Sequence, residues 1–124
     1  MRHIYEFIKI LNSSLNKDFV NYEKRKREVN LETCSNACKS NFLKEIDRLH
    51  SNIKTFDLNK PLTIEETIED KKSPINTKST FGREIIFLID HTIHHFAFIK
   101  IIANDHEITL PESIGLAFST RAHN

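Results

Sequence analysis

Apolar residues recur at three- and four-residue spacing in three stretches of the chain, which is the spacing of one helix face. The first stretch, residues 2–17, predicts an amphipathic helix. The second stretch runs to about residue 56 and begins at a possible Thr33 or Ser35 N-cap. The positions predicted to be buried are Ile4, Phe7, Ile8, Leu11 and Leu15 in the first helix, and Ala37, Phe42, Leu43, Ile46, Leu49, Ile53 and Phe56 in the second.

The third stretch, Phe81–Ala103, is the longest apolar run of the chain. Ser79 or Thr80 can cap it, and the periodic pattern ends near residues 104–106, so a long helix is predicted here. The pattern shows that helices dominate the fold.

The segment before this helix has a different pattern. Pro61 ends the preceding helical stretch, and β-branched residues follow between residues 62 and 68. Residues 75–80 can run back beside them across a turn at Asp70–Pro74. The prediction is a short hairpin or an extended loop before the last long helix, while residues 19–32 are predicted to be a connection.

Composition agrees with a single helical domain over residues 1–124. Two glycines and three prolines are few for a turn-rich β architecture, and a formal charge of +1 argues against a nucleic-acid partner. The two cysteines, Cys34 and Cys38, indicate packing residues in a reducing compartment. No signal peptide is recognised, and Asp90 with three histidines interrupts the long apolar run, so we expect a cytoplasmic protein with no membrane partner.

Three of the seven histidines, His91, His94 and His95, lie within the long apolar run. Residues four apart on a helix project from the same side, so the imidazoles of His91 and His95 can bind one metal ion. Their face also carries apolar residues and therefore points inward. His94 lies about 100° away from His95 and could be held by Asp90 or carry a proton.

Two ligands are too few for a tight metal site, because catalytic zinc sites usually have three protein ligands and an open position. His3 continues the apolar stripe of the first helix and is the preferred third ligand. His50, at the edge of the second stripe, is the reserve. His106 and His123 are predicted to be exposed.

The segments FGREIIFLIDHTIHHFAFIKII and LPESIGLAFSTR resemble the DinB-like superfamily of bacterial helical bundles, and RHIYEF and NYEKRKRE extend the resemblance over nearly the whole chain. The resemblance implies an all-α four-helix bundle with a three-histidine metal site. Its early-helix ligand falls on His3, and its H-x-x-x-H pair falls on His91 and His95.

This sequence departs from that pattern at its start. Related chains carry a helix before the early histidine, whereas here His3 is close to the first residue. The resemblance therefore implies three long helices, with a fourth that is missing or supplied by a partner, and a possible homodimer.

The function expected from this reading is that of a metal-dependent enzyme. His3, His91 and His95 would hold Zn²⁺, Ni²⁺ or Fe²⁺ and activate water or a thiol for hydrolysis or thiol transfer on a small molecule. Arg83 and the basic run Lys24–Arg27 are weak candidates for binding an anionic part of a substrate or thiol cofactor, and a solvated loop is the favoured interpretation of that run. The alternative is a non-catalytic bundle with a structural metal or none, acting as a dimerisation or interaction module.

Overall fold

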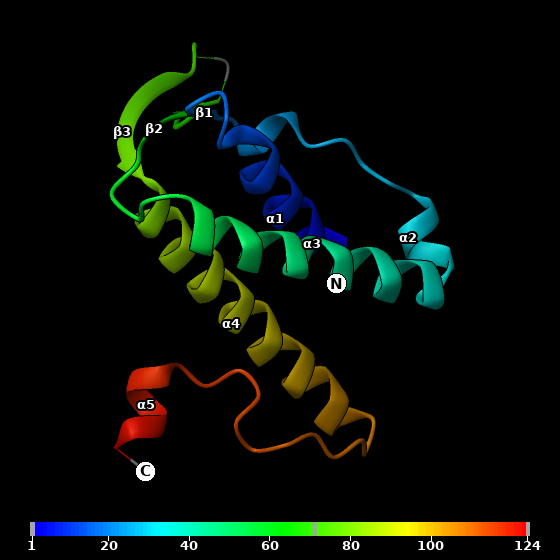
Figure 1. Ribbon diagram of the computed structural model, residues 1–124. Helices are drawn as coiled ribbons and strands as arrows, with labels where there is room; N and C mark the ends of the chain where they lie inside the picture. The colour runs from blue at the N-terminus through cyan, green and yellow to red at the C-terminus, as the bar shows by residue number, and fades with distance from the viewer. Residues whose placement is uncertain (1, 71, 124) are drawn as a thin grey trace. The chain divides into compact units, whose positions relative to one another are not determined.

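The structure is a computed structural model that describes residues 2–70 and 72–123. Its elements, in chain order, are α1 (Arg2–Ser14), β1 (Phe19–Val20), the 3-10 helix η1 (Tyr22–Lys24), α2 (Asn30–Thr33), α3 (Ser35–Thr55), β2 (Pro61–Glu66), β3 (Ile75–Thr80), α4 (Phe81–Asp105) and α5 (Phe118–Ala122) (Figure 1). The chain forms two compact units that divide after Ile85, inside α4. Each unit is described by itself below.

The apolar face of α1 forms the centre of the first unit. The five positions predicted from the stripe are all buried, with 8% exposure at most, so this prediction is confirmed. The helix ends at Ser14, before the predicted end, because the Lys17 N–H bonds to the Ser14 carbonyl in a turn and Asp18 then adopts a positive φ of 54°.

Helices α1 and α3 pack against each other through a polar contact as well as an apolar one. Asn12 is 4% exposed. Its amide donates to the Glu45 carboxylate at 2.8 Å and accepts from the Asn52 amide at 2.9 Å. A buried amide without partners costs about 1–3 kcal/mol, so these bonds fix how the two helices align.

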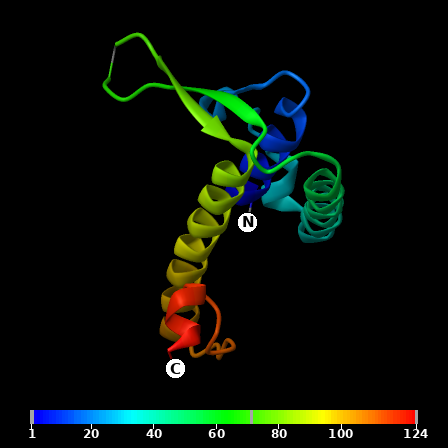
Figure 2. The same ribbon diagram turned by 60° about the vertical axis from the view of Figure 1, so that its left-hand side comes forward.

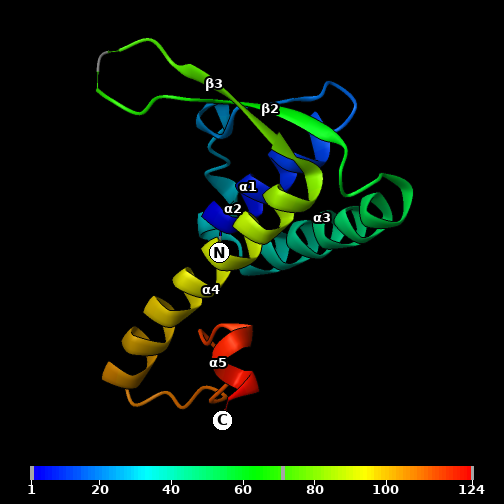
Figure 3. The same cartoon turned by 90° about the vertical axis from the view of Figure 1, so that its left-hand side faces the viewer.

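Strand β2 is the centre of a three-stranded mixed sheet. It pairs in parallel with β1 and antiparallel with β3. Leu62 and Ile64 lie two residues apart on one face of the strand and are both buried, as the alternation of side chains in a strand requires. The β2–β3 hairpin is twisted and extends away from α1 and α3 (Figures 2 and 3).

The expectation of an all-α, DinB-like bundle is wrong, because the first unit contains this mixed sheet. The two arms of the expected hairpin are present as β2 and β3. Strand β1, however, lies within the predicted connection, where the Asp18 carbonyl accepts a hydrogen bond from the Thr63 N–H at 2.8 Å and starts the parallel pairing. A strand of two residues is too short to leave a periodic signal in the sequence. The turn predicted over Asp70–Pro74 includes Lys71, which lies outside the described residues.

Helix α4 begins directly where β3 ends, with no residue between them. The Thr80 hydroxyl accepts a hydrogen bond from the Arg83 N–H at 3.2 Å, which confirms one of the two predicted caps. The Gly82 N–H donates to the Leu58 carbonyl at 2.7 Å. A Cβ at Gly82 would lie 3.1 Å from that oxygen, so this close approach favours glycine. Phe81 is fully buried beside it and anchors the start of the helix.

In the second unit, α4 ends at Asp105, within the predicted range. The Ile108 N–H bonds to the Ala103 carbonyl at 2.8 Å and the Glu107 N–H to the Asn104 carbonyl at 3.1 Å. With Glu107 at φ 58°, these bonds form a Schellman motif, which satisfies the last carbonyls of the helix.

The chain then turns back along α4 (Figure 2). Gly115, at φ 76°, packs so closely on the helix that a Cβ there would lie 2.6 Å from the backbone nitrogen of Ala97. The Lys100 ammonium donates to the Glu112 carbonyl at 2.8 Å. Glycine is therefore required at position 115 for two reasons, the positive φ and the lack of space.

Helix α3 differs from its prediction in two respects. Its N-cap is Cys34, which makes no side-chain capping bond, rather than Thr33 or Ser35. Leu43 and Ile53 belong to its apolar stripe but are 53% and 37% exposed. The periodicity identifies the apolar face correctly, but it does not show which parts of that face are covered.

Helix α4 has the length and apolar composition of a helix that could cross a membrane. A single helix of this kind is weak evidence of a membrane span, because it rests on length and composition only. The expectation of no membrane partner therefore stays a prediction.

Candidate metal centre

His91 and His95 lie one turn apart on α4 and face each other. Their ring centroids are 4.7 Å apart with the rings nearly perpendicular. A ring nitrogen of each lies within 4.8 Å of the other. Two imidazole nitrogens on one tetrahedral ion are roughly 3.4 Å apart, so small rotations of the side chains would bring both into bonding distance. The pair thus fits a divalent metal in spacing and in donor type.

The surroundings of the pair are half-buried and aromatic. The ring of Phe87, one turn earlier, stacks on His91 at a centroid distance of 5.6 Å. On the helix, Ala97 lies more than 100° round the axis from both histidines, so the tail that packs on Ala97 covers a different face.

His94 is exposed and lies apart from the pair. Its ring contacts Phe98 edge-on at 5.0 Å and His95 at 6.2 Å. These ring contacts take the place of the predicted contact with Asp90, which is itself exposed.

His3 lies in the first turn of α1 and is half-buried, with its ring edge-on to Phe7 at 4.7 Å. It belongs to the first unit, whereas His91 and His95 belong to the second. Its role as the third ligand stays a prediction. His50, His106 and His123 are exposed.

The basic run Lys24–Arg27 makes ion pairs within the first unit. Lys24 pairs with Glu65 at 3.0 Å, and hydrogen bonds from Lys24 and Asn21 hold the pKa of the Glu65 carboxyl below its usual range. The two arginines of the run pair with other carboxylates, Arg25 with Glu6 at 3.6 Å and Arg27 with Glu32 at 3.3 Å. Much of the positive charge predicted to bind an anion is therefore matched by acidic side chains of the same chain.

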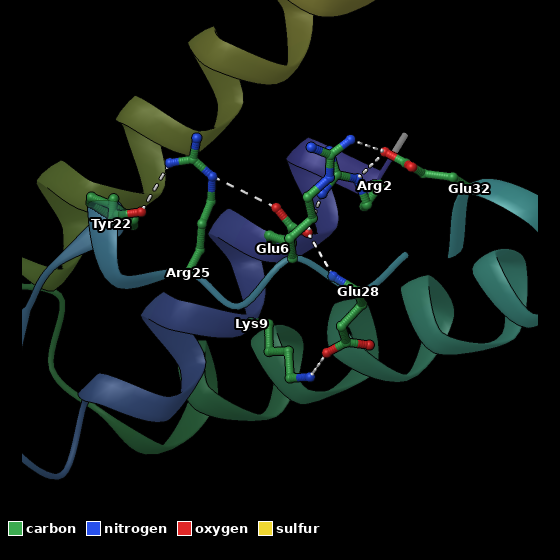
Figure 4. A network of polar contacts seen from close by, with 8 residues as sticks. Arg2, Glu6, Lys9, Tyr22, Arg25, Glu28 and Glu32 are labelled. Atoms are coloured by element: carbon green, nitrogen blue, oxygen red, sulfur yellow. Dashed lines mark hydrogen bonds and ion pairs between the residues drawn. The ribbon is translucent and has the colours of Figure 1, made fainter. Parts of the chain in front are cut away.

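Glu6 is the centre of this network (Figure 4). It is 3% exposed and accepts hydrogen bonds from Arg2 at 3.0 Å and from the Glu28 N–H at 3.4 Å. Glu28 in turn forms an ion pair with Lys9. The network ties the loop after η1 to the first turns of α1, where His3 lies. Sequence reasoning missed it because its members are far apart in the chain. Glu6 also lies on the side of the first helix opposite the apolar stripe, where an exposed charge is expected.

A second buried cluster joins η1 to the start of α4. The Tyr22 hydroxyl donates to the Glu84 carboxylate at 2.8 Å, and the Ser79 hydroxyl donates to its other oxygen at 2.5 Å. Glu84 is 6% exposed. Burial, and then the nearby Glu84 charge, raise the pKa of the Tyr22 phenol far above its usual range, so this phenol remains a hydrogen-bond donor. In the sequence, Glu84 is recognisable only as an acidic residue near the start of the long apolar run.

The chain is similar to a fungal protein of known name. The chain is 34% identical over 116 residues, 93% of its length, to a protein named FK506-binding protein 5 from Rhizopus delemar. The match covers 30% of that protein, so the chain spans less than a third of its relative. No family model matches the sequence. No solved structure matches it either.

These findings correct the expectations that came from the DinB-like resemblance. A relative named for FK506 binding, together with the mixed sheet, contradicts membership of that superfamily. The expected three-histidine hydrolase or thiol transferase is contradicted by the same relative. The supposed loss of a first helix depended on the resemblance and is withdrawn with it.

Proposed function

We propose that this chain is a binding domain, without the hydrolase or transferase chemistry first expected, and that its ligand is a divalent metal ion. The observation that carries the proposal is the His91–His95 pair, with ring centroids 4.7 Å apart on one face of α4. Imidazole donors suit zinc, nickel and iron(II), so the choice among Zn²⁺, Ni²⁺ and Fe²⁺ stays open.

In this proposal His3 supplies the third nitrogen. It is the histidine at the apolar end of the α1 stripe, and its ring contacts Phe7 edge-on. Three imidazoles leave one position of a tetrahedral ion for water or a group from a ligand.

The test is the metal content and metal affinity of tag-free protein, measured by elemental analysis and by competition with a chromophoric chelator. We expect one equivalent of metal in the wild type and a loss of affinity of more than about 100-fold in His91→Ala and in His95→Ala, because even the partners of metal ligands are worth about 10–100-fold. His94→Ala is the matched control from the same helix and should keep the metal. Metal that is sub-stoichiometric and insensitive to His91→Ala would contradict the proposal.

The third ligand is tested separately. His3→Ala should weaken binding, while His50→Ala, which changes an exposed histidine on α3, should not. Circular dichroism of each variant shows whether the fold is kept. A folded His3→Ala protein with wild-type affinity would remove His3 from the site and leave the pair.

A second candidate function is FK506 binding, with or without peptidyl-prolyl isomerase activity. It is favoured by the similarity to a protein with that name over 93% of this chain. The name describes the whole relative, of which the match is 30%, so the property need not reside in the matched part. Calorimetric titration of the chain with FK506, in the absence of metal, separates this candidate from metal binding.

A further inference from the structure

A half-open cavity of about 680 Å³ lies in the first unit, between α2 and the beginning of α3. Its lining residues are Leu31, Glu32, Thr33, Ser35, Cys38, Lys39, Phe42 and Leu43. The inner wall is mainly hydrocarbon and sulfur, with Leu31 buried at its base and Leu43 53% exposed at its edge. This size and this mixture of an apolar wall with a few polar groups are typical of small-molecule sites.

The rim of the cavity carries a positive charge that the protein does not neutralise. Glu32 pairs with Arg2 at 2.9 Å and with Arg27 at 3.3 Å, so its negative charge is already matched. Lys39, by contrast, takes part in no ion pair among residues 2–70 and 72–123. The first turn of α3 contains no acidic residue, and its positive dipole end adds to the potential of Lys39.

We propose that this cavity binds an aliphatic monocarboxylate such as a medium-chain fatty acid. The hydrocarbon chain lies against Leu31, Phe42 and Leu43, and the carboxylate lies at the rim near Lys39. Charge complementarity selects an anion over a neutral lipid, and the apolar wall selects a hydrocarbon chain over a small polar anion. This inference uses none of the histidines and does not depend on the proposed metal site.

The alkylation rates of the two free cysteines can report ligand binding in the cavity. Cys38 lines the cavity, whereas Cys34 is exposed one turn earlier and is not part of its wall. Iodoacetamide alkylation of the two thiols, followed by mass spectrometry, is measured with laurate, decanoate and octanoate. EDTA is present, so that a bound metal cannot hold the carboxylate. We expect laurate to slow alkylation of Cys38 severalfold and to leave Cys34 unchanged.

Chain length provides a quantitative check. Each buried methylene is worth about 0.8 kcal/mol, so affinity should rise roughly fourfold per added carbon from octanoate to laurate until the cavity is filled. Equal protection by all three acids, or equal protection of both cysteines, would overturn the proposal.

Charge is tested with a matched pair of variants on α3. Lys39→Gln should weaken laurate binding about tenfold, whereas Lys44→Gln, an exposed lysine outside the cavity, should have no effect. Dodecanol should bind more weakly than laurate in the wild type and equally in Lys39→Gln. If dodecanol and laurate bind the wild type equally, the carboxylate has no role and the proposed ligand class is wrong.

Discussion

Glu84 is a buried carboxylate whose described partners are hydroxyl groups rather than cations. Tyr22 and Ser79 each donate to one of its oxygens, and the first turn of α4 adds a favourable dipole. The Tyr22 ring stacks on Phe7 at a centroid distance of 5.0 Å, so the phenol is held in place by the core of α1. This residue cluster fixes the start of α4 on the first unit.

Tyr22→Phe should destabilise the protein by about 1–3 kcal/mol at neutral pH, because a buried carboxylate loses a donor. The wild type should also lose stability as the pH rises above 10.0, the ordinary pKa of tyrosine. The folded-state pKa of Tyr22 is raised, so the unfolded chain releases this proton first and unfolding gains from high pH. Urea unfolding followed by circular dichroism from pH 7 upwards measures both effects.

Ser79→Ala is the control for this prediction. It removes the other donor to Glu84 and should lower stability without changing the alkaline slope. An alkaline slope that persists unchanged in Tyr22→Phe would show that another group causes it.

At the scale of elements, the end of α4 and the returning tail are set by two residues with positive φ. Glu107 provides the left-handed residue of the Schellman motif, a conformation that costs a non-glycine residue about 1 kcal/mol. Gly115 allows the tail to contact the helix backbone at Ala97. Glu107 is therefore a residue type that its backbone conformation disfavours. At position 115, by contrast, glycine is the only residue that fits.

Gly115→Ala should detach or displace the tail. The new Cβ would lie 2.6 Å from backbone atoms of α4, and the positive φ adds strain, so we expect a loss of roughly 2 kcal/mol or more. Hydrogen exchange should show the loss in residues 110–122 and around Ala97, with α1 unaffected. Glu107→Gly is the matched opposite change and should stabilise the same unit by up to about 1 kcal/mol. If hydrogen exchange in residues 110–122 is unchanged in Gly115→Ala, the close packing of the tail on α4 is contradicted.

Periodicity predicted the long elements well because each repeats its pattern over several turns. The α1 stripe, the end of α4 and the Thr80 cap are all present. Strand β1 and helix α2 were missed because two and four residues are too few to establish a period. The resemblance then led to an all-α bundle, in which a parallel strand pair had no place.

The candidate site was predictable only in part. Helix spacing gives the His91–His95 pair, because it depends on one element alone. The carboxylate network around Glu6 and the partners of Glu84 depend on contacts between residues distant in the chain, which spacing does not encode. The same limit applies to His3, which lies on a different element from the pair and far from it in the sequence.

At the scale of the whole molecule, α4 exposes a large amount of apolar surface. Its exposed apolar side chains are Ile86, Ile89, Phe98, Ile101 and Ile102. Exposed apolar side chains gathered on one helix are typical of an interaction surface. We propose a homodimer through this helix.

Light scattering coupled to size exclusion should give twice the chain mass for the wild type. Ile101→Lys, which places a charge in the exposed surface of α4, should give the monomer. Ile68→Lys changes an equally apolar residue that is 72% exposed outside this helix, and should leave the dimer intact. A wild-type monomer, or recovery of the protein with membranes, would contradict this arrangement.

Phe81 of α4 directly follows Thr80 of β3, and this junction constrains which insertions and deletions the sequence can accept during evolution. A loop would absorb a gained or lost residue, but none is present here. One residue inserted at this junction would rotate all later side chains by about 100° around α4, or would move every side chain of β3 to the opposite face of the sheet. Substitutions on the exposed sides of the two elements have no such effect. We therefore expect divergence among relatives to proceed by replacement at this point, with length changes confined to other connections.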